Sequence, residues 1–323
     1  MISLNLSQCS GFTHHRSGWA YCINALRPFH SKAGIILDDF MERSFSWKLN
    51  EYYCGNNPHN LPYKQDWIGF LHNPPNPPDW FEIYNSPQAI LDRQVFKESL
   101  STCKCFVTLS EYLGKWLRKR VEVPVISIKH PTRIPLIKWS PSKFLSCHPK
   151  KIIQIGYWLR KLESIFDLQS PPQFCKVWLP SEKDHAIGLF DKYKSLLPQP
   201  HSYLFKDSSV AICDTVTNEE YDYLMSSSVV FLDLYDSSAN NAVIECVASN
   251  TPILINKIDA VVEYLGEDYP LYFNNLNHAA QLLSNTNNII KAHTYLKQMD
   301  KRWLSGHLFS QSLVKSLSYI VSG

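Results

Sequence analysis

The segment from residue 228 to residue 273 constrains the fold of this chain more than any other stretch. It contains a β-rich apolar run at 229–235, a polar break, an amphipathic run at 239–249 and a second apolar run at 252–256. Short apolar runs that alternate with amphipathic stretches indicate βαβ units around a parallel sheet. We therefore predict an α/β fold.

The polar break after the first apolar run has the composition of a helix cap. Asp236, Ser237 and Ser238 offer side-chain oxygens to helix amides, and Glu245 follows inside the predicted helix. In open α/β sheets, ligands bind where helix N-termini meet the carboxyl ends of strands, because free amides and the helix dipole stabilise negative charge there. The segment therefore predicts an anion site suited to a diphosphate.

Length and composition limit the classes of protein to consider. A chain of 323 residues exceeds the size of most single cores, so two domains of roughly 150 residues are expected. The hydrophobic content of 45% indicates a packed globular protein, and the net charge of +3 is too small for a broad nucleic-acid-binding surface. We expect no nucleic-acid partner.

The cysteines and the hydropathy pattern bear on the compartment. The nine cysteines lie mostly in apolar runs and include no Cys-x-x-Cys pair, which favours reduced thiols and disfavours a structural zinc site. The first residues lack the pattern of a signal peptide, and no run approaches about eighteen apolar residues. A cytoplasmic protein, at most peripherally bound to a membrane, is expected.

The amino-terminal half repeats the alternation of strands and helices. A proline-containing stretch without a clear period, 131–151, indicates a linker to the second half. The predicted strands are 2–6, 34–37, 67–72, 105–110 and 123–128, and the predicted helices are 19–26, 91–100 and 111–120.

Candidate substrate contacts follow the strand 67–72. His72 is followed by NPPNPPDW at 73–80, where four prolines restrict the backbone. Asn73 and Asp79 of this loop are candidate polar contacts, and Trp80 and Phe81 are candidate stacking surfaces. A rigid loop beyond a strand end is suited to holding a substrate. For His72 this role and a place in a proline-rich connector are equally expected, whereas the connector is favoured for the others.

Two further features of this half have ordinary structural alternatives. Gly18 permits close backbone approach to a ligand, although an ordinary turn accounts for it equally well. Asp38 and Asp39 end a predicted strand, and paired acids suit metal binding or acid–base chemistry. Acids at a strand end are more often solvated, so we expect these two side chains to be exposed.

The predicted helix 111–120 is basic and amphipathic. It carries Lys115, Arg118, Lys119 and Arg120 around Trp116. Such a helix can bind an anionic membrane surface or an acidic partner. A solvated helix face explains the pattern as well and is the favoured alternative.

The second half opens with KIIQIG, a predicted strand that ends at Gly156 and is followed by Arg160 and Lys161. Two cations beyond a strand end can hold a diphosphate, arginine as a planar fork and lysine as a compact charge. A surface pair is the alternative.

Thr217 and Glu220 predict a capping box. Other predicted elements are the helices 218–226, 259–265 and 308–321 and the strands 174–179, 209–213 and 270–273.

These motifs resemble the GT-B fold glycosyltransferases, particularly the retaining enzymes of glycosyltransferase family four. The resemblance is strongest over 151–273, in IIQIG with its basic residues, in VVFLDLY and in SSANNAVIECVASNTPILIN. It implies two Rossmann-like domains that face each other across a cleft: an acceptor domain at 1–140 and a nucleotide-sugar domain at 150–305. The helix 306–323 would pack back on the amino-terminal domain.

The resemblance also implies roles for single residues. Glu245 matches the second glutamate of the family's paired-glutamate motif, which binds the donor ribose, and His72 resembles a strand-end histidine near the reacting sugar. The first glutamate should lie eight positions earlier, where this chain has Ser237, so Asp236 is the candidate replacement. The residues implied to hold the donor diphosphate or sugar are Arg160, Lys161, Ser238, Ala239, Asn240 and Asn241.

The expected function is transfer of a hexose or pentose from a nucleotide-diphosphate donor to a glycan, lipid or other acceptor. The resemblance implies retention of anomeric configuration, no metal and no cofactor. His72 and Asp236 are the catalytic candidates, and Gly18, Asn73 and Asp79 are the acceptor-binding candidates. The competing hypothesis is a non-catalytic GT-B protein that binds a nucleotide or glycan, and a sugar-nucleotide epimerase ranks third.

Overall fold

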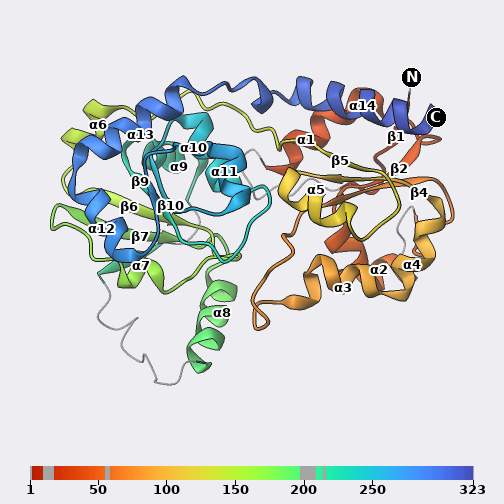
Figure 1. Ribbon diagram of the computed structural model, residues 1–323, viewed down its shortest axis with the longest axis horizontal. Coiled ribbons are helices and arrows are strands. Elements are labelled where there is room, and N and C mark those ends of the chain that lie inside the picture. Colours follow the sequence, from red (N-terminus) through yellow and green to blue (C-terminus); the bar gives the residue numbers. More distant parts are fainter. Residues whose placement is uncertain (1, 10–17, 55–58, 197–208, 214–215, 323) are drawn as a thin grey trace. The chain divides into compact units, whose positions relative to one another are not determined.

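A computed structural model describes residues 2–9, 18–54, 59–196, 209–213 and 216–322. The chain divides into two compact units. The first comprises Met1–Arg133, Asp236–Ala239 and Lys301–Gly323, and the second comprises Ile134–Tyr235 and Asn240–Asp300. Each unit contains a parallel sheet with helices between its strands (Figure 1), which confirms the predicted α/β fold.

The sheet of the first unit contains five parallel strands in the order β1-β2-β3-β4-β5. All five strands were predicted, to within a few residues, because each is a short apolar run. Their bounds are β1 Leu4–Asn5, β2 Ile35–Asp38, β3 Trp67–Leu71, β4 Cys103–Thr108 and β5 Val125–Ser127.

Helices cover both faces of this first sheet. Alternate residues of a strand point to opposite faces, and in β3 Ile68 and Phe70 join one core cluster while Trp67 and Leu71 join another. The first cluster includes α1 and α14, and the second includes α5. The helical segments of this unit are α1 Trp19–Leu26, α2 Leu49–Cys54, α3 Pro87–Asp92, α4 Gln94–Ser99, α5 Glu111–Arg118, α14 Gly306–Ser322 and the short η1 Arg27–Phe29, η2 Arg43–Trp47, η3 Ile83–Asn85, η4 Leu100–Thr102 and η5 Arg302–Leu304.

The sheet of the second unit contains six parallel strands in the order β11-β10-β9-β6-β7-β8. The first strand of the unit, β6, lies between β7 and β9, so the chain builds the sheet outward in two directions. This is the Rossmann order, with its switch point between β6 and β9. The bounds are β6 Lys150–Ile155, β7 Phe174–Leu179, β8 Val210–Ile212, β9 Val229–Leu232, β10 Ile253–Asn256 and β11 Tyr272–Phe273.

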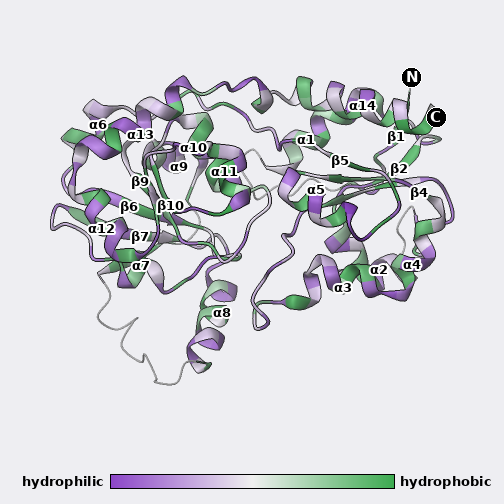
Figure 2. Ribbon diagram, viewed as in Figure 1, coloured by the Kyte–Doolittle hydropathy of each residue, from purple (hydrophilic) through white to green (hydrophobic). Residues whose placement is uncertain are grey.

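Helix α9 of the second unit begins where its cap predicts. Thr217 and Glu220 form the expected capping box of α9, and green hydrophobic segments mark β10, α10 and α11 in Figure 2. The stretch predicted as a linker contains α6 and the buried side chains of Trp139 and Phe144, so part of it is an ordered piece of this unit. The helices are α6 Pro141–Ser146, α7 Ser164–Asp167, α8 Lys183–Ser195, α9 Asn218–Ser227, α10 Asn241–Ser249, α11 Asp259–Leu265, α12 Leu276–Ser284 and α13 Thr286–Gln298.

Membrane-spanning helices and metal-binding clusters are both absent from the described ranges. None of their helices is both long enough and apolar enough to cross a lipid bilayer. No group of three or more His, Cys, Asp or Glu side chains in these ranges is placed to hold a metal ion.

Candidate functional site

The switch point of the second sheet is formed by the turn after β6. Gly156 has a φ of +73°, a conformation that suits glycine, and the chain then turns toward the end of β9. Arg160 forms a bridge with Leu234, and the amide of Lys161 donates to the carbonyl oxygen of Asp233 over 2.8 Å. The two basic residues predicted from sequence therefore lie where ligands bind in Rossmann folds.

Within the described residues, the side chain of Arg160 is held by neutral oxygen atoms. Its Nε donates to the carbonyl of Ile155 over 3.1 Å, and Nη1 donates to that of Trp158. Nη2 donates to Oδ1 of Asn240 over 3.4 Å. Burial lowers the pKa of Arg160 to about 10, so the guanidinium stays charged at neutral pH. No carboxylate among the described residues forms an ion pair with it, which leaves a fixed positive charge at the switch point.

Lys161 differs from Arg160 because a carboxylate neutralises it. Its Nζ lies 2.9 Å from Oδ1 of Asp233, whose side chain is only 9% exposed. The second carboxylate oxygen of Asp233 accepts from the Ser164 hydroxyl over 2.9 Å. The lysine side chain therefore ties the turn after β6 to the end of β9.

The N-terminus of α10 lies beside Arg160. Asn240 is its N-cap, and the same Oδ1 that meets Arg160 accepts from the amides of Ala242 and Val243 over 3.1 and 3.4 Å. Asn241 is the first helical residue and is partly exposed. The helix begins two residues later than predicted, since Asn240 and not Ser238 caps it.

Glu245 projects from the second turn of α10 and is partly exposed. Its Oε2 accepts a hydrogen bond of 2.5 Å from the hydroxyl of Tyr221 on α9. Tyr221 also interacts electrostatically with Arg160. Sequence reasoning missed this tyrosine, because nothing in the helix 218–226 distinguishes it from a surface residue.

The segment Asp236–Ala239 groups with the first unit. Oδ2 of Asp236 accepts from the amide of Asn76 over 2.8 Å and from the hydroxyl of Tyr112 over 3.2 Å, while Oδ1 accepts from the amide of Ser237. Ser238 shares a 2.8 Å hydrogen bond with Ser110, the N-cap of α5. Both carboxylate oxygens of Asp236 are thus engaged by protein donors, and burial raises its pKa.

His72 follows β3 in the first unit and is partly exposed. Its Nε2–H donates to the carbonyl oxygen of Asp39 over 2.9 Å, which leaves Nδ1 as the nitrogen with a lone pair. The ring stacks on Phe40 at a centroid distance of 4.0 Å and meets Trp19 edge-on at 4.6 Å. Burial lowers the pKa of His72 to about 3, so the ring is neutral at physiological pH.

A buried carboxyl group supports the backbone of His72. Oε1 of Glu42 accepts from the amides of His72 and Asn73 over 2.7 and 2.6 Å. Its Oε2 is buried and has no hydrogen-bond partner in the described part of the chain. Burial raises the pKa of Glu42 to about 7. Sequence reasoning missed this residue, since a lone acid three positions after Asp39 carries no recognisable motif.

The expectation that Asp38 and Asp39 are solvated was wrong, because both side chains are fully buried. The π-helical segment η2 follows β2 and supplies Arg43 and Ser44 as partners, which the sequence pattern does not reveal. Asp39 pairs with Arg43 and accepts from Nε1 of Trp19 over 2.9 Å. Asp38 accepts from hydroxyl groups of Tyr63 and Ser44.

Comparison with solved structures identifies the architecture. No protein-family model and no curated protein sequence matches the chain. Anabaena Alr3699/HepE in complex with UDP and glucose is similar at a TM-score of 0.58 and 14% identity, over 78% of this chain and 71% of that one. An α,α-trehalose-6-phosphate synthase from Burkholderia multivorans gives 0.55 and 12%, over 93% and 75%. The chain has the GT-B fold.

The remaining acceptor-site predictions lie in the first unit of this GT-B fold. Gly18 is buried at the N-cap position of α1, and Nδ2 of Asn73 donates to the carbonyl of Asn85 over 3.0 Å. Asp79 is exposed. Phe81 is fully buried and offers no stacking surface, in line with the connector that was favoured for it, whereas Trp80 is partly exposed.

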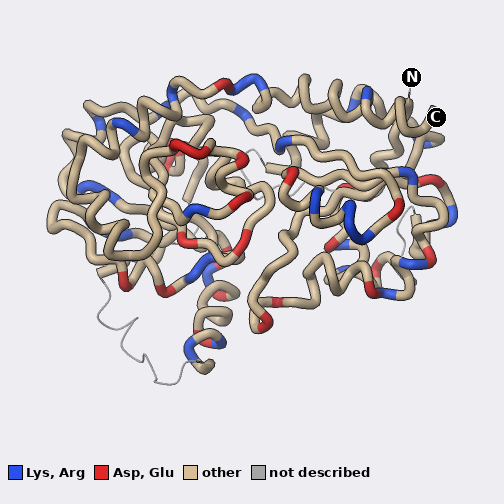
Figure 3. The backbone as a smooth tube through the Cα atoms, in the orientation of Figure 1, with Lys and Arg blue, Asp and Glu red and all other residues tan. Residues whose placement is uncertain are grey.

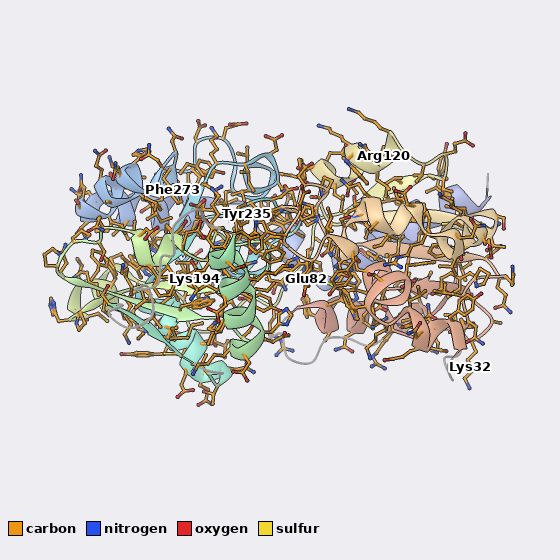
Figure 4. All side chains as sticks on the ribbon, turned by 90° about the horizontal axis from the view of Figure 1, so that it is seen from below. Lys32, Glu82, Arg120, Lys194, Tyr235 and Phe273 are labelled. Atoms are coloured by element: carbon orange, nitrogen blue, oxygen red, sulfur yellow. The ribbon has the colours of Figure 1, made fainter. Side chains whose placement is uncertain are left out.

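Helix α5 carries the predicted basic face, seen as blue segments in Figure 3. Arg118 forms a bidentate pair with Glu111, and Arg120 stacks over the ring of Trp116 at 4.0 Å. Arg120 lies on the outside of the first unit (Figure 4), and Lys115 and Lys119 are also exposed. Membrane contact through this face stays a prediction.

Proposed function

We propose that this protein is a glycosyltransferase that uses a nucleotide-diphosphate sugar as donor. The observation that carries the proposal is the guanidinium of Arg160, fixed at the switch point of a Rossmann sheet without a carboxylate partner in the described chain. HepE, which shares the fold, binds UDP-glucose. Charge develops on the diphosphate as the sugar leaves, and a preorganised cation stabilises that charge.

The second unit supplies the donor site in this proposal. Arg160 and the amides at the start of α10, around Asn241, meet the diphosphate. Glu245, oriented by the hydroxyl of Tyr221, accepts hydrogen bonds from the ribose. Lys161 positions the turn and does not contact the phosphates, because Asp233 neutralises it. The proposed transfer requires no metal ion and no cofactor.

The first unit supplies the contact to a sugar hydroxyl. The neutral ring of His72 presents Nδ1 as a hydrogen-bond acceptor, because Nε2–H is committed to Asp39. Asp79 is exposed and stays a candidate acceptor contact. Gly18 can contribute only backbone atoms, and Asn73 holds the loop after β3 through its bond to Asn85. Asp236 acts structurally, since both of its carboxylate oxygens are engaged.

A second hypothesis has specific support. Ser237 stands where the family's first glutamate is expected, and both carboxylate oxygens of Asp236 already accept hydrogen bonds from protein donors. These facts favour a GT-B protein that binds a nucleotide sugar or glycan without turnover. The two hypotheses agree on the role of Arg160 and differ only in catalysis.

One experiment tests the proposal. The purified protein is incubated with UDP-, GDP- and ADP-sugars, with and without glycan and lipid-linked acceptors. The release of nucleoside diphosphate is measured. We expect release with at least one donor, and NMR of the product should show a retained anomeric configuration. Tight donor binding without release would support the non-catalytic alternative, and absence of both binding and release would refute the two hypotheses together.

Variants test the donor site directly. Arg160→Ala should raise the dissociation constant for the nucleoside diphosphate roughly 10- to 100-fold, because charge-assisted hydrogen bonds are lost. Arg27→Ala is the control, since Arg27 is an exposed arginine in the first unit whose Nε donates to the side chain of Asn24. Unchanged affinity in the Arg160 variant would remove this residue from the site.

A further inference from the structure

The segment after β2 holds His72 at three points. The carbonyl of Asp39 accepts from Nε2–H, the ring of Phe40 stacks on the imidazole, and Glu42 accepts from the amides of His72 and Asn73. Three residues of one four-residue segment, 39–42, therefore fix both the ring and the backbone of the histidine.

The contact through Glu42 sets the direction of the chain as it leaves β3. Two successive amides converge on the single atom Oε1, at 2.7 and 2.6 Å. Backbone amides need an acceptor, and no neighbouring strand in the described residues supplies one beyond the end of β3 at Leu71. Without the carboxyl oxygen the turn at His72 and Asn73 would rearrange to find other partners.

The charges around Glu42 indicate that its carboxyl group acts as a hydrogen-bond acceptor and not as a negative charge. Asp38, Asp39 and Glu42 are all fully buried, and Arg43 is the one cation that is buried with them in the described residues. Arg43 pairs with Asp39 and not with Glu42. A proton on Oε2, which has no partner, relieves the repulsion and leaves Oε1 free to accept both amides.

We propose that Glu42 is a positioning residue, which fixes His72 for contact with a sugar hydroxyl by accepting both amides through Oε1. The inference rests on the proposed function. It predicts that glutamine can replace Glu42, because the amide oxygen accepts the same two bonds. Aspartate cannot replace it, because its shorter side chain does not reach both amides although it keeps the charge.

Turnover by the whole chain tests whether glutamine replaces Glu42 better than aspartate does. Glu42→Gln should keep kcat within about twofold of the wild type, while Glu42→Asp should lower kcat roughly 10- to 100-fold with the donor KM unchanged, as expected when a catalytic group is misplaced by about 1 Å. The controls are Glu98→Gln and Glu98→Asp at an exposed glutamate of α4. The opposite order, with aspartate active and glutamine impaired, would show that the charge matters and would overturn the proposal.

A double-mutant cycle separates positioning from a loss of stability. In a His72→Ala background, Glu42→Asp should lower kcat by less than about twofold, because the side chain that Glu42 positions is already absent. An undiminished effect in that background would refute the action through His72. Circular dichroism confirms that each variant is folded, and Glu42→Gln supplies the test if Glu42→Asp does not fold.

A measurement that needs no turnover distinguishes this inference from the proposed function. Long-range ¹H–¹⁵N spectra report which ring nitrogen of His72 carries the proton, and the His72→Ala spectrum assigns the signals. The wild type and Glu42→Gln should share one set of His72 shifts, and Glu42→Asp should differ. If no donor is turned over but this pattern holds, the proposed function fails and the positioning role stands. Identical shifts in all three would overturn the positioning role.

Discussion

Replacing Glu42 with glutamine should remove a fall in stability that the wild type shows between about pH 4.5 and pH 7. Burial raises the pKa of Glu42 from its ordinary value of 4.5 to about 7. The folded chain therefore binds the proton more tightly than the unfolded chain. Between these two pH values the folded state holds more protons, so its stability decreases as the pH rises, and above about pH 7 the loss is complete.

The size of the effect follows from the two pKa values. Each pH unit between them contributes about 1.36 kcal/mol, so the whole interval amounts to roughly 3 kcal/mol. Asp39, whose pKa is raised to about 6, and Asp38 act in the same direction. Both remain in the Glu42→Gln variant, so the difference between variant and wild type isolates the contribution of Glu42 and its coupling to these neighbours.

The assay is urea unfolding at pH 5, 6, 7 and 8, followed by tryptophan fluorescence and circular dichroism. The free energy of unfolding of Glu42→Gln minus that of the wild type should grow by up to about 3 kcal/mol from acid to alkaline pH. Glu98→Gln, which removes an exposed carboxylate, should show no such trend. A difference that stays constant with pH would show that Glu42 ionises normally and would refute the account of the buried carboxyl group.

Three further substitutions test the remaining parts of the site. Gly156→Ala should cost ~1–2 kcal/mol and weaken nucleotide binding, because φ is +73° and a methyl group would lie 3.3 Å from Nη2 of Arg160; thermal unfolding and calorimetry measure the two effects. Asn240→Ala should cost about 1 kcal/mol in urea unfolding through loss of the α10 cap. Arg43→Met should cost ~3–5 kcal/mol at pH 8 and less at pH 5, where the partner carboxyl of Asp39 takes up a proton. A loss that does not depend on pH would contradict the last prediction.

The fold could be predicted from the sequence because the strands are buried on both faces and appear as short apolar runs. The errors in the elements came from local backbone features that the hydrophobic pattern does not show. The predicted helix 91–100 is interrupted at Arg93, which has an extended backbone, so α3 and α4 are separate helices. Residues 141–146 contain a proline, but as the first residue of a helix it is compatible with α6.

The sequence pattern located the strand ends that carry candidate residues, but not the partners of those residues. The pattern placed Arg160 and Lys161 at a strand end, but it could not show that Asp233, 72 residues away, neutralises only the lysine. The same limit applies to Glu42, whose role depends on two amides about 30 residues later in the chain. Residue type and spacing reveal strand ends and caps, whereas long-range pairing decides which charges remain for a ligand.

Helix α14 has a consequence for how the protein folds as it is synthesised. Its Phe309, Leu313 and Leu317 pack into the same core cluster as Leu4 and Trp19. Domains generally fold in order as they leave the ribosome. Here the first unit to be translated must wait, with one face of its sheet covered only by α1, until the entire second unit has been made. A chaperone that binds apolar surface would therefore have its longest opportunity on the first half of this chain.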